Sequence, residues 1–317
     1  MLPAPKYFAQ LPNPLVLQIV GADAAKVVNN MSTNDLAKLP VDAALESFVT
    51  DVRGWVVAHV GVLKQVDRVW LLGSHATPSA LVNHIDRYII REDAAVSDVS
   101  QKYALFIIGD GPQLPVDEGT DGRASDANAI AVQPTAGRRA TPITTPSLFT
   151  CECSLPVFGQ GTRLLCCPSE QAARAIERLR ASGSEFCSAQ RFEWLRISSF
   201  WPLHPADIGD KTIPQELDRD RQAISFTKGC YLGQETIARL DARGQLQKKL
   251  CLIELTPSRE IAIGATLYNG EKEVGHITSL ARDPASGSVR ALAILRRGNF
   301  AAGTQLTGNG FEAQVLP

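Results

Sequence analysis

The residues best suited to chemistry are packed into positions 226–235, which read FTKGCYLGQE. Gly229 and Gly233 flank Cys230, and such glycines let a backbone adopt positive φ or approach a ligand closely. The run that follows, QETIARLDARG, predicts a short helix. Cys230 would then precede a helix N-terminus with Lys228 two residues away, a setting that favours the thiolate form. The stretch indicates a reactive thiol, with a small residue filling a tight turn as the structural alternative.

Basic residues accumulate around and after this cysteine. Between residues 228 and 249 there are five basic side chains against two acidic ones, in a chain with 32 Lys and Arg and 33 Asp and Glu. The seven are Lys228, Glu235, Arg239, Asp241, Arg243, Lys248 and Lys249. The local excess can serve an anionic ligand, or it can be an ordinary solvated face. The balanced total argues against direct nucleic-acid binding and against an anionic membrane surface.

The other six cysteines have spacings typical of core residues. Cys151 with Cys153, and Cys166 with Cys167, lie in the strand-like runs CEC and LLCCP, where adjacent side chains point to opposite faces. These spacings match no established zinc or iron–sulfur ligand pattern, and the five histidines show none either. We therefore expect buried free thiols and no tightly bound metal.

The start of the chain carries no targeting signal that we can identify. MLPAPKYFAQLPN lacks both the apolar core of a signal peptide and the arginine-rich amphipathic pattern of a transit peptide. No apolar run approaches about 18 residues, the length that crosses a bilayer. Seven cysteines in 317 residues, an odd and modest number, suit a reducing compartment. We expect a cytoplasmic protein of the bacterial type with no membrane partner.

Strand and helix signals come in blocks along most of the chain. Residues 14–36 predict a strand and then a helix opened by Asp23, and residues 45–74 predict three consecutive strands. Pro78 begins a second helix, and a later strand is followed by a third helix capped by Ser169. Consecutive strands favour an α+β fold with two related subdomains over a parallel doubly wound sheet. The side chains expected to face inward are Ala24, Val27, Val28, Met31, Leu81, Ile85, Tyr88, Ile89, Ala172, Ile176 and Leu179.

The last quarter of the sequence has a different pattern of predicted secondary structure. Short β runs are separated by NGEK, DPASG, RRGN and TGNG, without a helical period. Turn signals at these intervals favour a small antiparallel barrel or sandwich over residues 246–317. Residues 1–245 would form one α+β region, with subdomains at about 1–110 and 148–245 and a Gly-, Pro- and Thr-rich linker at 111–147.

Four motifs, read together, give the chain a family resemblance. They are TNDL at 33–36, IPQEL at 213–217, ISFTKGCYLGQETIARLDARG at 224–244 and VGHITS at 274–279. In this order the chain resembles the YgfZ family of folate-binding proteins, which are relatives of the glycine-cleavage T-protein (GcvT). The segment K-G-C-Y-x-G-Q-E with its trailing A-R and R-G is the most specific part, and the linker matches least.

The resemblance implies both a fold and a function. The implied fold is a pair of GcvT-like folate-binding subdomains joined to a small C-terminal antiparallel β-barrel, with tetrahydrofolate in a central channel. The implied function is support of iron–sulfur cluster assembly or repair in target enzymes, including radical enzymes that thiolate tRNA. The partners would be folate and iron–sulfur enzymes or cluster-assembly proteins. The signature cysteine falls on Cys230, and the other motif positions fall on Lys228, Gly229, Tyr231, Gly233, Gln234, Glu235, Arg239 and Arg243.

Four residues outside that segment are expected to contact folate by the same resemblance. Trp194 is the expected stacking aromatic, with Phe192 as the alternative under a small alignment shift, and both can instead be core residues. Arg196 is either a folate contact or a surface helix charge, and Gln215 lies in IPQEL. Ser198 stands where relatives often place an acidic or amide side chain against the pterin. We therefore expect a weaker or water-mediated pterin contact there.

The alternative function is that of the T-protein itself, an aminomethyltransferase that transfers a one-carbon unit to tetrahydrofolate. T-proteins read roughly G-G-x-x-D-D where this chain reads RGWVVAHV, so the carboxylate positions fall on Val57 and Ala58. An alanine cannot accept a proton or orient an amine, which argues against aminomethyl transfer. The sequence therefore favours a folate-binding accessory protein and does not establish that it is an enzyme.

Overall fold

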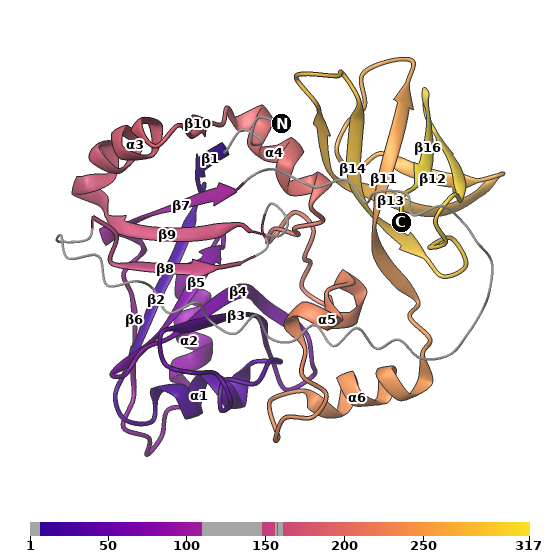
Figure 1. The fold of residues 1–317 in the computed structure, drawn as a ribbon. Helices are drawn as coiled ribbons and strands as arrows, with labels where there is room; N and C mark the ends of the chain where they lie inside the picture. Colours follow the sequence, from indigo (N-terminus) through magenta and orange to yellow (C-terminus); the bar gives the residue numbers. More distant parts are fainter. Residues whose placement is uncertain (1–6, 110–147, 156, 158–160) are drawn as a thin grey trace, which may run out of the picture.

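The computed structural model describes residues 7–109, 148–155, 157 and 161–317, so the predicted linker at 111–147 lies outside the described residues. Two β-sheets pack face to face, helices cover their outer faces, and a barrel lies beside them (Figure 1). Within the described residues, no helix combines the length and the apolarity needed to cross a bilayer.

The first sheet has the strand order β3-β4-β5-β2-β6. Its strands are β2 (Pro14–Val20), β3 (Ala43–Thr50), β4 (Val56–Lys64), β5 (Arg68–Ser74) and β6 (Ala95–Asp98). Helices α1 (Ala24–Met31) and α2 (Pro78–Asp86) cover its outer face and share one apolar cluster with it. The predicted meander and both helices are confirmed, including the inward face of α1.

The second sheet has the strand order β10-β1-β7-β9-β8. Its strands are β1 (Tyr7–Gln10), β7 (Tyr103–Gly109), β8 (Cys151–Ser154), β9 (Arg163–Pro168) and β10 (Glu185–Phe186). Helix α3 (Ala172–Ala181) packs on its outer face. The prediction that Ser169 caps this helix is wrong, because Ser169 lies in a short 3₁₀ turn, η2 (Ser169–Gln171), and its Oγ donates to the Gln101 carbonyl at 3.1 Å. A second 3₁₀ turn, η1 (Ser100–Lys102), precedes β7.

Sheet membership departs from the predicted subdomain boundary at about residue 110. Strands β1 and β7 come from the N-terminal part of the chain, yet they pair antiparallel with each other, and β7 pairs with β9. The physical reason is that β7, YALFIIG, is apolar on both faces and buried along nearly its whole length. Such a strand is stable only in the middle of a sheet that is covered on both sides. The first sheet therefore uses residues 14–98, and the second combines β1 and β7 with residues after 148.

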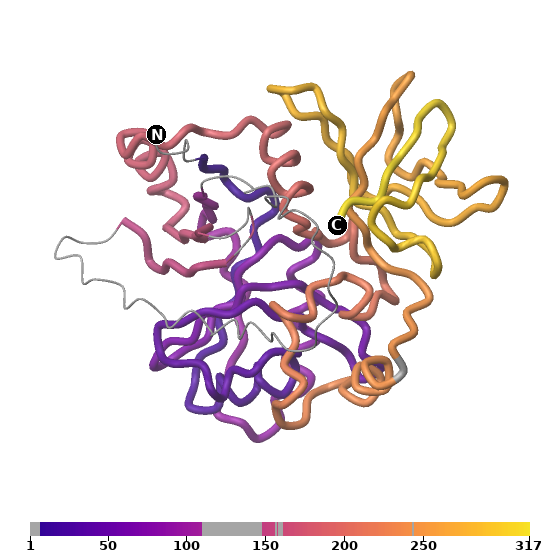
Figure 2. The backbone as a smooth tube through the Cα atoms, turned by 45° about the vertical axis from the view of Figure 1, so that its right-hand side comes forward, coloured from indigo at the N-terminus to yellow at the C-terminus, as the bar shows by residue number. Residues whose placement is uncertain are grey.

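After the second sheet the chain returns to the first one. Helix α4 (Ala189–Ser198), the 3₁₀ turn η3 (Pro214–Leu217), and helices α5 (Asp220–Ala223) and α6 (Gln234–Arg243) follow in order. In Figure 2 the orange part of the chain runs alongside the indigo and purple first sheet and α1 before it enters the barrel. This return brings two motifs that are far apart in sequence into contact.

The C-terminal residues form a closed antiparallel barrel with the order β11-β14-β13-β12-β15-β16. Its strands are β11 (Lys248–Pro257), β12 (Thr266–Asn269), β13 (Lys272–Arg282), β14 (Val289–Arg296), β15 (Gln305–Gly308) and β16 (Phe311–Val315). A separate apolar cluster fills it. Closure removes the exposed strand edges, and the expected barrel is confirmed.

Candidate functional site

Cys230 is the exposed cysteine of the chain, and the other six are buried free thiols. Burial raises the pKa of Cys167 and of Cys187 to about 11 and that of Cys251 to about 12. Cys166 and Cys167 belong to different apolar clusters, as expected for neighbouring residues on a strand. Since a thiolate is the nucleophile and metal ligand, only Cys230 combines the right atom with solvent access.

Lys228 anchors the loop that carries Cys230. Its side chain is buried, and Nζ donates to the carbonyls of Asn29 at 2.6 Å, Ser32 at 2.7 Å and Asn34 at 2.9 Å. An ammonium group has three hydrogens, so all of them are used on main-chain acceptors. Two of these acceptors lie at and just beyond the C-terminal end of α1, where helix carbonyls lack intrahelical partners. Lys228 therefore positions the loop and does not donate to the thiol.

The aromatic ring of Tyr231 completes the surroundings of this buried cation. Nζ of Lys228 lies 4.9 Å from the Tyr231 ring centroid, which is within the range of a cation–π contact. Burial lowers the pKa of Lys228 to about 8, although the nearby Asp35 opposes the shift. Burial also raises the pKa of Tyr231 to about 12. Lys228 and Tyr231, which lie close to Cys230 in the sequence, therefore have buried side chains that hold the loop in place.

The TNDL motif holds the other end of the same loop. Thr33 Oγ1 donates to the Ala223 carbonyl at 2.6 Å, and Asn34 Nδ2 donates to the Gln222 carbonyl at 2.9 Å. The amide of Ser225 in turn donates to the Thr33 carbonyl at 2.9 Å. These hydrogen bonds join residues about 190 positions apart in the sequence. The two motifs noted in the sequence therefore form one structural unit.

A contact between two glycines closes the loop on its far side. Gly233 has φ of 76°, and a Cβ there would lie 2.3 Å from the Gly54 Cα, so only glycine fits both the conformation and the space. Beside it, Thr50 Oγ1 donates to the Leu232 carbonyl at 2.8 Å. Gly229 does not have positive φ, and a Cβ there would meet nothing within 4 Å, so neither the backbone conformation nor packing within the chain requires a glycine at this position.

The remaining motif residues lie on α6. Gln234 is its half-buried first residue, and its amide donates to the Tyr231 carbonyl at 3.2 Å. Glu235 and Arg239 are exposed. Arg243 is the last residue of the helix, and its side chain is outside the described part of the structure. Gly244 ends the helix with φ of 59°, as the sequence predicts.

Three of the five basic side chains of this segment are held by partners within the chain, while Arg239 is exposed. Lys228 is buried, Lys248 lies 3.5 Å from a Glu216 carboxylate oxygen, and Lys249 lies 2.9 Å from one of Asp218. These cations have partners within the chain, so the local excess of charge does not by itself mark an anion site.

Three of the four predicted folate contacts are buried and make contacts within the described part of the chain. Phe192 and Trp194 are buried on α4, and the Arg290 guanidinium of the barrel lies 5.1 Å from the Trp194 ring centroid. Gln215 is buried, and its Nε2 donates to the Ile237 carbonyl at 2.7 Å, which ties η3 to α6. Two cavities of the described structure are the central cavity, which lies between the two sheets, and the outer cavity, which has about 500 Å³ of free volume and is lined by residues such as Gln10, His75 and Ser169. None of the three predicted contacts lines either cavity. Ser198, whose hydroxyl is buried without a hydrogen-bond partner among the described residues, lines neither cavity.

The fourth predicted contact, Arg196, links α4 to the barrel. It is buried, and its Nη1 donates to the Trp201 carbonyl at 3.0 Å and to Asp207 Oδ2 at 2.9 Å. Its Nη2 donates to Ser279 Oγ at 2.9 Å and to Glu193 at 2.6 Å, and Nε also faces Glu193. All five guanidinium hydrogens are therefore used inside the chain. Neither sequence alternative, a folate contact or a surface charge, describes this arrangement.

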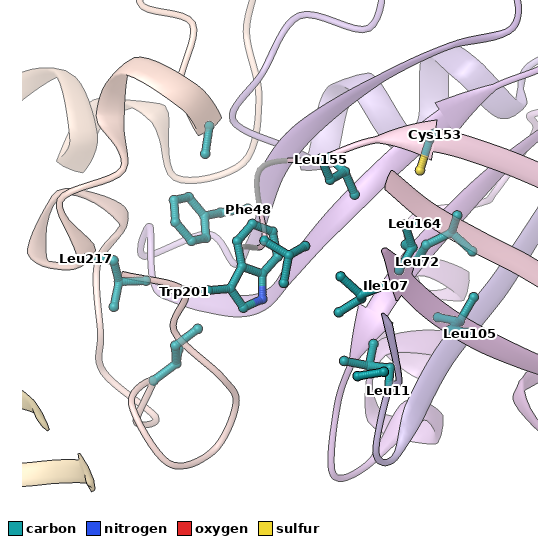
Figure 3. Close-up of a cluster of buried hydrophobic side chains, with 14 of the residues drawn as sticks. Leu11, Phe48, Leu72, Leu105, Ile107, Cys153, Leu155, Leu164, Trp201 and Leu217 are labelled. Carbon is teal, nitrogen blue, oxygen red and sulfur yellow. The ribbon is translucent and has the colours of Figure 1, made fainter. Parts of the chain in front are cut away.

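The central cavity lies between the two sheets and is nearly filled. Leu11, Leu72, Ile107, Leu155 and Trp201 are among its lining residues, and Figure 3 shows their side chains converging from both sheets and from the segment after α4. Its free volume is about 10 Å³, which is room for about one water molecule. A ligand pocket for a molecule of folate size needs several hundred Å³. The aromatic and apolar lining suits a pterin, but the space in this conformation does not admit one.

A buried ion network borders this cavity and was not foreseen from the sequence. Arg219 Nη2 donates to Glu46 Oε2 at 2.6 Å, Arg219 Nε also donates to Glu46, and His59 Nε2 lies 2.9 Å from Glu46 Oε1. Burial alone would raise the pKa of Glu46, but Arg219 and His59 lower it to about 2. His59 and Trp201 both line the cavity, with ring centroids 4.4 Å apart. The signal that could have found Trp201 is the run SFWPLHP, where two aromatic residues directly precede a proline and a histidine directly precedes another.

The positions that correspond to T-protein carboxylates are apolar in the structure. Ala58 is fully buried in the cluster beneath α1 and α2, and the half-buried Val57 packs against that cluster. Across the described ranges, no three His, Cys, Asp or Glu side chains are arranged to hold a metal ion.

Known proteins resemble this chain in sequence and in fold. No family model matches the chain. The chain is similar to the tRNA-modifying protein YgfZ of Yersinia enterocolitica, at 23% identity over 255 residues that cover 80% of this chain and 72% of that protein. It is also similar to the tRNA-modifying protein YgfZ of Shigella dysenteriae serotype 1, at 22% identity over 242 residues, 76% of this chain and 69% of that one.

A solved structure has the same fold. The glycine cleavage system aminomethyltransferase T from Bartonella henselae matches with a TM-score of 0.76 and 15% identity, covering 99% of this chain and 86% of that one. At this identity the likeness concerns the fold alone. The chain is therefore a homologue of the YgfZ proteins built on the GcvT-like fold, an α+β region with a C-terminal antiparallel β-barrel.

Proposed function

We propose that this chain is an accessory protein for tRNA modification that acts through Cys230. The observation that carries the proposal is one exposed thiol on a loop fixed by buried hydrogen bonds, in a chain whose other cysteines are buried. The names of the YgfZ relatives support the connection with tRNA modification. An anchored, exposed thiol can reach a group on another protein without unfolding its own surroundings.

The target enzymes we propose are iron–sulfur enzymes, including radical enzymes that thiolate tRNA, or the proteins that assemble their clusters. A thiolate is a soft ligand for iron, so Cys230 would bind iron of a partner's cluster transiently during assembly or repair. The chain supplies the thiol, and the partner supplies the iron and sulfide. The family resemblance of the K-G-C-Y-x-G-Q-E segment supports this assignment.

The test uses cells that lack the protein. Wild-type protein should restore the activity of iron–sulfur enzymes in extracts, and Cys230→Ser at equal abundance should not. A matched control is Cys187→Ser, because Cys187 is a buried thiol outside the loop. Equal restoration by Cys230→Ser and by the wild type would contradict the proposed role of the thiol.

We also propose that reduced folate is the ligand of the central cavity, after the cavity widens. The GcvT-like fold and the aromatic lining support this part, whereas the small free volume requires side chains to move first. Tetrahydrofolate supplies the one-carbon and pterin chemistry of this fold when it is bound, and the chain's residues supply the walls. Calorimetric titration of tetrahydrofolate should show saturable binding that Cys230→Ser retains. A titration without binding heat would contradict the proposal that reduced folate is the ligand.

A second candidate is one-carbon transfer of the T-protein type, which the aminomethyltransferase fold favours. The buried Ala58, in place of a carboxylate that could accept a proton, counts against it. Incubation with tetrahydrofolate and candidate methylamines separates the two functions. We expect no methylenetetrahydrofolate at enzymatic rates.

A further inference from the structure

The side chain of Trp201 occupies the space between the two sheets where a ligand of this cavity would lie. Trp201 is buried, its ring centroid is 4.4 Å from that of His59, and the Arg219 guanidinium lies 4.9 Å from it on the ring face. From the other side Leu155 packs so closely on Gly61 that a Cβ there would lie 2.1 Å from its Cδ1. The cavity is therefore closed by side chains that face one another across it (Figure 3).

We propose that Trp201 controls access of the ligand to the central cavity. Its indole fills the place of the fused ring system of a reduced pterin, and such a ring system binds only in molecules where the Trp201 segment has moved away. This inference rests on the proposed folate binding and adds the residue that opens the site. The indole is itself a fused bicyclic group, so the space it vacates is close in size to the bicyclic head of that class of ligand.

The backbone around Trp201 is held by buried cations on both sides. Arg196 Nη1 donates to the Trp201 carbonyl at 3.0 Å, and the Trp201 amide donates to the Arg196 carbonyl at 3.0 Å. Arg219 Nη1 donates to the Phe200 carbonyl at 2.9 Å. Phe200 has φ of 55°, a left-handed conformation that a large side chain adopts at an energetic cost. The segment is therefore held in a strained conformation by its surroundings.

The barrel fixes the far end of this segment through the VGHITS motif. Asp207 Oδ1 accepts hydrogen bonds from Thr278 Oγ1 at 2.5 Å and from Ser279 Oγ at 2.7 Å. Its Oδ2 accepts from the Leu203 amide at 3.0 Å and from Arg196. One carboxylate thus joins the barrel, α4 and the cavity wall. Movement of the Trp201 segment and loosening of the barrel contact are therefore linked.

The expected effect on ligand binding follows from the population of open molecules. When the binding-competent state is a minor fraction, the apparent affinity falls by that fraction. Removing the indole makes the open cavity the main state. Trp201→Leu should therefore bind tetrahydrofolate about tenfold more tightly than the wild type or better. If the indole were a stacking partner for the ring, the same variant would bind more weakly.

The experiment titrates tetrahydrofolate calorimetrically into the wild type, Trp201→Leu and the matched control Trp70→Leu. Trp70 is another buried tryptophan, but it lines neither described cavity, so its variant should bind as the wild type does. Tighter binding by Trp201→Leu alone supports the inference. Unchanged or weaker binding overturns it, as does absence of binding to both the wild type and Trp201→Leu. Binding to Trp201→Leu without binding to the wild type supports the inference and contradicts the proposed folate function.

A second variant leaves the cavity residues in place. Thr278→Val combined with Ser279→Ala removes two donors to Asp207 from the barrel. With 5-fluorotryptophan incorporated, the fluorine resonance of Trp201, assigned by its loss in Trp201→Phe, should shift or broaden in this variant without any ligand. Affinity for tetrahydrofolate should rise several-fold. An unchanged resonance would overturn the link between the barrel and Trp201.

Discussion

The Cys230 loop and the wall of the central cavity are both held by buried cations that donate to main-chain carbonyls, but the results in the two regions are opposite. In the loop, buried Lys228 donates to three main-chain carbonyls and leaves the neighbouring thiol exposed. At the cavity, Arg196 and Arg219 donate to the carbonyls of Trp201 and Phe200 and keep the space closed. A buried cation on backbone acceptors fixes the chain in both places. What differs is whether a reactive atom or a filled cavity lies beside it.

Because of this difference, the reactivity of the Cys230 thiol and the binding of a ring ligand depend on different parts of the molecule. A thiol on an anchored loop can react in the conformation seen here, whereas a ring ligand requires the cavity wall to move. Cys230 also lines neither described cavity. Thiol reactivity and ligand binding should therefore be measurable independently of each other.

The largest contrast should appear in thiol reactivity. At neutral pH in the native state, iodoacetamide should modify Cys230 at least about 1,000-fold faster than the six buried cysteines, because these react only after local opening. Mass spectrometry of peptides after timed alkylation measures each site. Cys230→Ser should abolish the fast reaction. Comparable rates at Cys187 would break the distinction between exposed and buried thiols.

A side chain introduced at the contact between Gly233 and Gly54 should have the next largest effect, which is on the free energy of unfolding. Gly233→Val should lower the free energy of unfolding by about 3 kcal/mol or more, because the position needs positive φ and the Gly54 backbone occupies the space of a side chain. Urea denaturation provides the measurement. Gly229→Ala is the matched control on the same loop and should change stability by less than about 0.5 kcal/mol, since open space surrounds it. Equal effects at both glycines would refute the close contact.

Loss of the loop's cation should come next in size. Lys228→Met keeps an unbranched apolar chain but leaves three buried or partly buried carbonyls without their donor, which should cost about 2 kcal/mol of unfolding free energy. The exposed Lys26 provides the control variant Lys26→Met, which should change stability little. Chemical denaturation of the three proteins compares them. A Lys228→Met protein as stable as the control would show that the loop is held in another way.

The cavity wall should give a small effect that depends on pH. Burial lowers the pKa of His204, which lines the cavity, to about 4 from its ordinary 6.5. The unfolded chain therefore binds more protons between these values, so the free energy of unfolding falls as pH drops from 6.5 to 4. Because His204 is only half-buried and solvent screens its charge, we expect a loss of about 1 kcal/mol relative to His204→Gln. Parallel pH profiles for the two proteins would contradict a neutral His204 in the wall.

Local patterns in the sequence predicted the secondary structure around the site. Pro78 begins α2 and Gly244 ends α6, because prolines and left-handed glycines act within a few residues. Asp23 does precede α1, but its side chain makes no capping hydrogen bond and accepts from the Asp93 amide instead. The barrel was also recoverable from its turn signals. The inward face of α1 followed directly from helical spacing.

The partners of the charged residues could not be predicted in this way. Lys228 was expected to favour the thiolate of Cys230, but its acceptors lie 194 to 199 positions away in sequence. Arg196 likewise finds Ser279 on the barrel, 83 positions away. Such contacts depend on how the chain returns to the first sheet and how the barrel docks, which no local pattern encodes.

The most direct test of the central claim, that Cys230 is the working thiol, is the thiolated nucleoside content of tRNA. Cells that lack the protein would express the wild type, Cys230→Ser or Cys187→Ser at equal abundance, and the nucleosides would be quantified by mass spectrometry. Wild type and Cys187→Ser should restore the thiolated nucleosides, while Cys230→Ser should leave them at the level of the deletion. Full restoration by Cys230→Ser would contradict the account.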